Sequence, residues 1–144
     1  MSRNVKRIVC LLMSLLLLCP LNLVASAASV GGENTIQPRF SYTNETFVGI
    51  DITTSGTAYC TTDVQGYSNV TKVHIKMTLQ KYTVLWWSKV ESWEATFYNV
   101  TGEICETAQV GSGRYRVKAE FTVYSGSDYE EITDFSPEKK VTIS

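Results

Sequence analysis

The sequence predicts an all-β protein, a single antiparallel β-sandwich of about seven strands. From residue 28 onward the chain has 12 Val, 7 Ile and 17 Thr but only two Leu, and all 16 aromatic residues lie in that part. β-Branched and aromatic residues favour pleated strands, whereas Leu and Ala favour helices. Apolar and polar residues also alternate in short segments, which is typical of strands with one solvated face. These segments recur with turn residues between them, as in two-sheet sandwiches.

The first 27 residues have the three-part layout of a secretory signal peptide. Three basic residues lie within the first seven positions, an apolar run covers residues 8–18, and Ala25-Ser26-Ala27 supplies small residues before a cleavage site. A membrane-spanning helix is the alternative, but it needs about 20 apolar residues, and Pro20 and Asn22 interrupt the run. We predict cleavage after Ala27, a secreted protein, and no membrane anchor once the signal is removed.

Removing the signal changes the charge and divides the chain. Residues 28–40 have no periodicity and contain a Gly pair and a proline, so they predict a flexible leader before a sandwich domain at 41–144. The whole chain carries −1, but ten basic and fourteen acidic residues remain after residue 27, a net charge of −4. Arg114, Arg116 and Lys118 alternate along one strand face, which is typical of a solvated sheet. This acidic balance argues against a nucleic-acid partner.

Period-two alternation places the strands along the sandwich domain. The clearest strands have inward residues at Val73, Ile75, Met77 and Leu79, and at Tyr115, Val117, Ala119, Phe121 and Val123. The expected strands are 48–52, 58–64, 73–79, 86–97 (as one strand or two), 104–110, 115–123 and 129–133, with Val141 and Ile143 as an extension of the last.

One local motif indicates the type of sandwich. Gly113-Arg114-Tyr115-Arg116-Val117-Lys118-Ala119 resembles the start of the sixth strand in immunoglobulin-like and fibronectin type III-like domains. In those domains a tyrosine two residues before a core position hydrogen-bonds back to the preceding loop, the tyrosine corner. The resemblance implies this role for Tyr115, whereas an ordinary inward-facing tyrosine is the alternative.

Two cysteines, Cys60 and Cys105, remain after the signal. In an exported protein a pair of cysteines predicts one disulfide, which here would close a loop of about 45 residues and contribute roughly 3–4 kcal/mol. Two unpaired buried thiols are the alternative. Cys105 has the opposite parity from Ile104 and Ala108, which we expect to point inward.

The tryptophans Trp86, Trp87 and Trp93 are the most prominent candidate for ligand binding. Trp87 and Trp93 have the same parity, so a regular strand would place both on one face, with Trp86 on the other. Exposed tryptophans can stack on sugar rings. The alternative is that one or two of them belong to the sandwich core.

No pattern predicts catalysis, a metal site or a cofactor. The sequence lacks the common hydrolase and metalloprotease motifs, and two cysteines without neighbouring histidines do not make a zinc site. Glu130, Glu131 and Asp134 offer a carboxylate pair or calcium ligands, although a solvated edge strand is the simpler interpretation. An unrecognised hydrolase would need a pocket with at least two of His74, Asp63, Asp128, Glu130 and Glu131.

The order of motifs from Gln37 onward resembles a family of small secreted β-sandwich proteins of unknown function from Gram-positive bacteria. The motifs that carry the resemblance are Gln37-Pro38-Arg39, Ser55 to Cys60, Thr71 to Lys81, Trp87 to Trp93 and Gly113 to Gly126. The resemblance implies export and a compact β domain, and it implies no catalytic residues.

These observations together predict a non-catalytic extracellular binding or interaction module. Its partner would be a cell-wall glycan, a host glycan or another protein, held on the face of Trp87 and Trp93. A structural protein of the envelope or matrix that self-associates through its edge strands is the alternative, and a hydrolase is a more remote one.

Overall fold

A computed structural model describes residues 40–143, which form eight strands and no helix. The strands are β1 (Thr43–Ile52), β2 (Thr57–Gly66), β3 (Lys72–Thr83), β4 (Trp86–Phe97), β5 (Thr101–Gln109), β6 (Gly113–Ser125), β7 (Asp128–Phe135) and β8 (Lys139–Val141). This part of the chain therefore has no helix of the length and apolarity needed to span a membrane. The predicted signal peptide at 1–27 and nearly all of the predicted leader at 28–40 lie outside the described residues.

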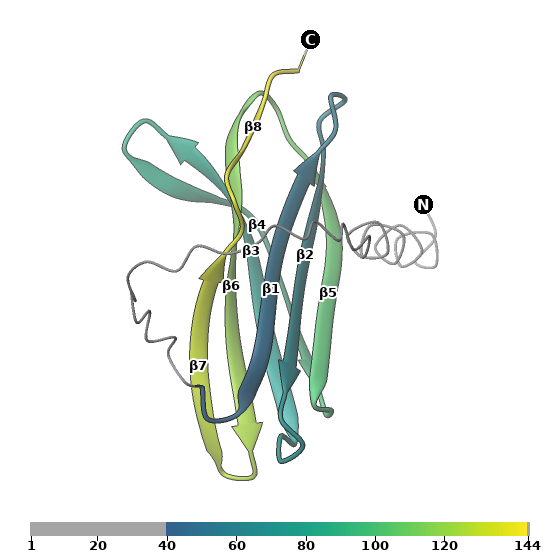
Figure 1. Cartoon of the computed structure of the whole chain (residues 1–144). Coiled ribbons are helices and arrows are strands. Elements are labelled where there is room, and N and C mark those ends of the chain that lie inside the picture. Colours follow the sequence, from purple (N-terminus) through teal and green to yellow (C-terminus); the bar gives the residue numbers. More distant parts are fainter. Residues whose placement is uncertain (1–39, 144) are drawn as a thin grey trace, which may run out of the picture. The chain divides into compact units, whose positions relative to one another are not determined.

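The strands form two antiparallel sheets that lie against each other (Figure 1). The three-stranded sheet has the order β1-β2-β5, and the five-stranded sheet has the order β4-β3-β6-β7 with β8 also paired to β6. In immunoglobulin constant domains the fourth strand joins the sheet of the first two. Here β4 pairs with β3 instead, which gives the fibronectin type III-like arrangement. The predicted antiparallel sandwich is confirmed.

The eighth strand exists because the chain breaks its pairing with β6 around Pro137. Pro has no N–H to donate to a β-ladder. Just before the break, Ser136 makes two hydrogen bonds to the backbone of β6. The N–H of Ser136 donates to the carbonyl of Val117 at 2.9 Å, and the N–H of Val117 donates to Ser136 Oγ at 2.8 Å. The chain then resumes pairing along β6 as β8, which continues the line of β7.

The core lies between the sheets and consists of the inward residues of each strand. On β3 and β6 the alternation predicted from the sequence is confirmed, because the inward residues are buried and, of their outward neighbours, only Thr78 is buried as well. Met77 lies opposite Ala119 and Leu79 opposite Val117 in the β3–β6 ladder. Complete burial of each large apolar side chain contributes about 1.5–3 kcal/mol. Because these buried residues all point into the core, the opposite face of the five-stranded sheet is the one that faces solvent.

Tyr115 forms the predicted tyrosine corner. Its side chain is 2% exposed, and its hydroxyl donates a hydrogen bond to the carbonyl oxygen of Gly111 at 2.9 Å. Gly111 lies in the loop between β5 and β6, so the bond ties that loop to the start of β6. A buried hydroxyl without a partner would be destabilising, and the loop carbonyl supplies that partner.

The predicted disulfide between Cys60 and Cys105 is wrong. Cys60 is a free thiol that points into the core. Cys105 lies opposite Thr61 in the β2–β5 ladder, one position away from Cys60, with its Sγ 3.8 Å from Thr61 Oγ1. Successive residues of a strand face opposite sides of a sheet, so the two sulfur atoms lie on opposite faces. Burial, with a smaller contribution from the charge of Glu91, raises the pKa of Cys60 to about 12.

Candidate binding surface

Aromatic and arginine side chains stack on the outer face of the five-stranded sheet. We call Tyr82, Trp87, Arg114, Arg116 and Phe135 the arginine–aromatic face. The ring centroids of Tyr82 and Trp87 are 5.3 Å apart at an interplanar angle of 61°. The Cζ atom of Arg116 lies 4.2 Å from the Trp87 ring centroid and 4.3 Å from that of Phe135. The Cζ atom of Arg114 lies 4.0 Å from the Tyr82 ring centroid. Four different strands therefore contribute to one continuous stack.

The alternation of β6 explains why the arginines reach this face. Tyr115 and Val117 are buried between the sheets, so Arg114 and Arg116 must point outward. Arg116 lies opposite Gln80 in the β3–β6 ladder, and its Nε donates to Gln80 Oε1 at 2.9 Å. The side chain of Arg116 is thus held at its Nε by Gln80 and on its flat faces by aromatic rings.

The stack keeps charged groups in fixed positions at a partly covered surface. Burial lowers the pKa of the Arg116 guanidinium, whereas the negative charge of Glu138 raises it. A guanidinium remains charged at neutral pH in proteins, so Arg116 is a cation there. Arg114 lies 3.4 Å from Glu138 in an ion pair that is largely exposed, and such pairs contribute little to stability. The remaining N–H groups of both arginines are available to an acceptor on a ligand.

A β-bulge separates the two tryptophans that the sequence predicts on one face. Trp87 lies opposite Tyr82 and Trp93 lies opposite Met77, but the register shifts between Leu79 and Gln80. Across that step β4 advances by two residues and leaves Val90 without a partner. One extra residue reverses the alternation of a strand. Trp93 therefore packs against the core while Trp87 points outward, and the predicted shared face is wrong.

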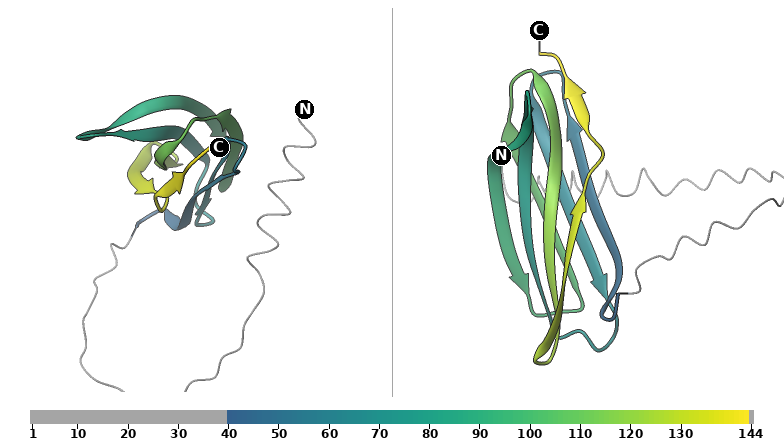
Figure 2. Two further views of the ribbon diagram at one scale, coloured as in Figure 1. Left: turned by 90° about the horizontal axis from the view of Figure 1, so that it is seen from above. Right: turned by 90° about the vertical axis from the view of Figure 1, so that its left-hand side faces the viewer.

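The turn of the β3–β4 hairpin exposes three consecutive apolar residues. Val84, Leu85 and Trp86 are 86%, 77% and 62% exposed, and we call them the apolar tip. Val84 has a φ of 49°, and the N–H of Leu85 donates to the carbonyl of Thr83 to close a tight turn. The hairpin extends beyond the body of the sandwich (Figure 1) and points away from it when viewed from above (Figure 2).

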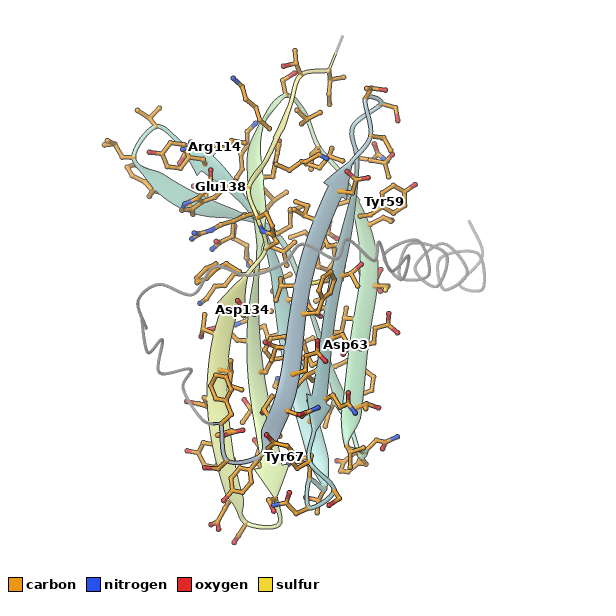
Figure 3. The ribbon with its side chains drawn as sticks, viewed as in Figure 1. Tyr59, Asp63, Tyr67, Arg114, Asp134 and Glu138 are labelled. Atoms are coloured by element: carbon orange, nitrogen blue, oxygen red, sulfur yellow. The ribbon has the colours of Figure 1, made fainter. Side chains whose placement is uncertain are left out.

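The two sheets differ in charge. All nine Lys and Arg residues of the described part lie on strands of the five-stranded sheet. β1, β2 and β5 have no basic residue and carry five acidic ones, which are Glu45, Asp51, Asp63, Glu103 and Glu106. Burial raises the pKa of Asp63, and the charges of Glu103 and Glu45 raise it further. Figure 3 shows Asp63 on the three-stranded sheet, away from Arg114 and Glu138.

The candidate catalytic residues are not brought together. His74 lies on the outer face of β3, with its Nδ1 2.9 Å from Thr96 Oγ1. Thr122 lies between His74 and Glu131 in the sheet, and Asp63 lies on the other sheet. Among residues 40–143 no group of three or more His, Cys, Asp or Glu side chains is arranged to hold a metal ion.

Glu130 and Asp134 join the two sheets at one side of the sandwich. Glu130 accepts hydrogen bonds from the backbone N–H groups of Ser41 at 2.8 Å and Tyr42 at 2.9 Å. Asp134 accepts one from the Thr46 hydroxyl at 3.1 Å. Burial raises the pKa of Glu130, but these backbone bonds and a bond from Thr43 lower it overall. Both carboxylates therefore have structural partners.

Sequence reasoning missed most of the arginine–aromatic face. It found Trp87 but interpreted the arginines of β6 as a solvated surface, and it did not single out Tyr82 or Phe135. The signal was present in part, because Arg114 and Arg116 flank an inward tyrosine on a well-predicted strand. Their aromatic partners lie far away in the sequence, so only the order of strands identifies them.

No known family matches this sequence, and no curated protein matches it. Among solved structures, the chain is similar to the sporulation control protein Spo0M from Bacillus subtilis, with 12% sequence identity and a TM-score of 0.43. The similarity covers 73% of this chain and 51% of the Spo0M chain, so this chain spans about half the length of that protein.

Proposed function

We propose that the protein is a secreted, non-catalytic binding module that holds its ligand on the arginine–aromatic face. The observation that carries this proposal is the stack itself, in which Arg116 lies between Trp87 and Phe135 at 4.2 and 4.3 Å. Side chains that are already fixed lose little conformational entropy when a ligand binds. The stack also combines flat apolar area with charged donors, a combination that is common at binding hot spots.

The chemistry of the face suits a glycan or a protein ligand. Aromatic rings stack on sugar rings or on apolar side chains, and guanidinium groups donate to hydroxyl, carboxylate or phosphate oxygens. Trp87 is the expected main contact, whereas Trp93 packs against the core and is not expected to touch the ligand. A cell-wall glycan, a host glycan or a surface protein each supplies this combination of groups.

An extracellular location is part of the proposal. It is supported by the signal-like segment at residues 1–27 and by the resemblance to secreted proteins of Gram-positive bacteria. The free and buried thiol of Cys60 is compatible with export, since a thiol sealed in a core is shielded from oxidants.

A pull-down with the mature protein tests the proposal. The protein is incubated with isolated cell walls and with immobilised host glycans, and its retention is compared with that of Trp87→Ala. Loss of a central aromatic contact should lower retention by about tenfold or more. The matched control is Tyr129→Ala, an exposed aromatic on β7 of the same sheet. Equal retention of Trp87→Ala and the unaltered protein on every ligand that binds would contradict the proposed contact surface.

Self-association as a structural protein of the envelope or matrix is the second candidate, and one observation favours it. The three-stranded sheet carries only acidic charges, whereas the five-stranded sheet carries all the basic residues of the described part. Copies stacked face to back would bring these charges together, and such heterologous contacts extend into chains. Sedimentation velocity over a range of concentration and salt tests this candidate. A monomer at high concentration and low salt argues against it.

A further inference from the structure

The apolar tip is unusual for a surface turn. Val84, Leu85 and Trp86 are consecutive and all largely exposed, and their hairpin projects from the sandwich (Figure 1). Single exposed apolar residues are normal on a protein surface. Three in a row at a projecting end are unfavourable in water unless they serve a contact.

The backbone of the tip is strained as well. Val84 lies at φ 49°, in the left-handed region, where a β-branched residue is disfavoured. Asn, Asp or Gly would fit this turn and would also be more soluble. An apolar side chain at such a position is a combination of strain and exposure that points to a function.

Basic side chains surround the base of the tip. Lys81 and Lys89 lie on the two strands of the hairpin, and Arg114 and Arg116 stack against Tyr82 and Trp87. Among residues 40–143, Glu138 is the acidic residue that pairs with one of these four groups, at 3.4 Å from Arg114. Glu91 is also on β4, but it lies beyond the bulge, where its charge acts on Cys60.

An apolar end above a ring of cations matches one kind of partner. A free anion or an acidic glycan would pair with the cations but leave the tip in water. An apolar groove on a protein would cover the tip but gain nothing from four positive charges. An anionic lipid bilayer accepts both, because apolar side chains enter the acyl boundary, Trp lies at the interface, and Lys and Arg meet the phosphates.

We propose that the protein attaches peripherally to anionic membranes by inserting Val84, Leu85 and Trp86 into the leaflet, with Lys81, Lys89, Arg114 and Arg116 at the headgroups. This attachment differs from a membrane-spanning anchor, since only a hairpin tip enters the lipid. Leu85 and Lys89 lie outside the arginine–aromatic face, so membrane attachment and ligand retention can be altered separately.

Vesicle co-sedimentation tests the attachment. The chain from Ala28 onward is used because it contains the whole sandwich and its core, and the vesicles are phosphatidylcholine with or without phosphatidylglycerol. The protein should sediment with the mixed vesicles at low ionic strength, and added salt should release it by screening the charges. Absence from the mixed-vesicle pellet at low salt, or equal sedimentation with both vesicle types, overturns the proposal.

Two matched pairs of variants locate the contact. Leu85→Ser should weaken binding to the mixed vesicles about tenfold, the loss expected when one large apolar side chain no longer enters lipid. Tyr98→Ser, at the opposite end of β4 and 84% exposed, should have no effect. Lys89→Gln should weaken binding about fivefold, whereas Lys72→Gln, at the far end of β3, should not. Equal binding of Leu85→Ser and Tyr98→Ser overturns the proposed insertion.

Tryptophan fluorescence gives an independent readout of insertion. Emission should shift to shorter wavelength when the mixed vesicles are added, because the Trp86 ring leaves water. Trp86→Phe should keep most of the binding but lose most of the shift, since phenylalanine preserves the apolar surface. A shift that persists unchanged in Trp86→Phe shows that Trp86 is not its source and contradicts the proposed insertion of Trp86.

Discussion

The part of the β3–β4 hairpin that lies within the sandwich, which we call its base, has different surroundings from the part near the apolar tip. At the base, Met77 and Trp93 lie opposite each other and pack into the core. Towards the tip, Tyr82 and Trp87 lie opposite each other on the outer face, next to Arg114. One hairpin thus contributes to the core of the sandwich at one end and to an exposed contact surface at the other. The difference shows that stability and binding can be separated along a single pair of strands.

The bulge at Val90 makes this division possible. In a regular strand Trp87 and Trp93 would share one face, and a single unpaired residue places them on opposite faces. Bulges also bend a strand, and the end of the β3–β4 hairpin stands away from the body of the sandwich (Figure 1). The bulge therefore directs Trp93 inward and Trp87 outward.

The largest difference between base and tip should appear in stability. Met77→Ala removes a completely buried side chain and leaves a cavity, so the free energy of unfolding should fall by about 3 kcal/mol. Leu85→Ala removes an exposed side chain and should change it by less than about 0.5 kcal/mol. Urea denaturation of both variants measures the contrast. Similar losses in the two variants would show that the tip packs as tightly as the base.

The tryptophan pair should show the same contrast with a smaller effect. Trp93→Ala should lower the free energy of unfolding by about 2 kcal/mol, less than for a fully buried tryptophan, because Trp93 is only partly buried. Its retention on a ligand should stay unchanged in a pull-down at a temperature where it remains folded. Trp87→Ala should show the reverse, with little loss of stability and a large loss of retention. A loss of retention in folded Trp93→Ala would disprove the division.

Sequence alone predicts the base of this hairpin much better than the half nearer its tip. The alternation of Val73, Ile75, Met77 and Leu79 is unbroken, so the inward face of β3 follows from local pattern. On β4 the apolar residues Trp86, Trp87, Val90 and Trp93 fit neither parity throughout. The face of each is decided by pairing with β3, which is a tertiary contact that local pattern does not contain.

The tyrosine corner and the disulfide also show that contacts close in the sequence can be predicted, whereas contacts set by strand register cannot. The tyrosine corner was predictable because Tyr115 and its acceptor Gly111 are four residues apart. The disulfide was not, because its geometry depends on the register of β2 against β5, where Cys105 lies opposite Thr61. The parity of Cys105 relative to its neighbours nevertheless indicated that its side chain faces away from the core.

The backbone strain at the tip gives a third contrast, because a substitution that relieves it should raise the stability of the protein. Val84→Gly should raise the free energy of unfolding by about 1 kcal/mol, because glycine adopts a positive φ without steric cost. Leu85→Gly, at a neighbouring position without a positive φ, should lower it slightly because glycine gains more freedom in the unfolded chain. Thermal unfolding of both variants decides the matter. A loss of stability in Val84→Gly would mean that the Val84 side chain has stabilising contacts at the tip.

The smallest effect should lie in the arginine–aromatic face, between base and tip. Arg116→Lys keeps the charge but loses the planar group held by Trp87, Phe135 and Gln80, and the free energy of unfolding should fall by about 0.5 kcal/mol. Arg114→Lys should cost less, because Arg114 has one close ring, that of Tyr82 at 4.0 Å, and its ion pair with Glu138 lies at the surface. Denaturation of the two variants at matched ionic strength gives the comparison. If both substitutions cost the same, the second ring on Arg116 and its bond to Gln80 add nothing to stability.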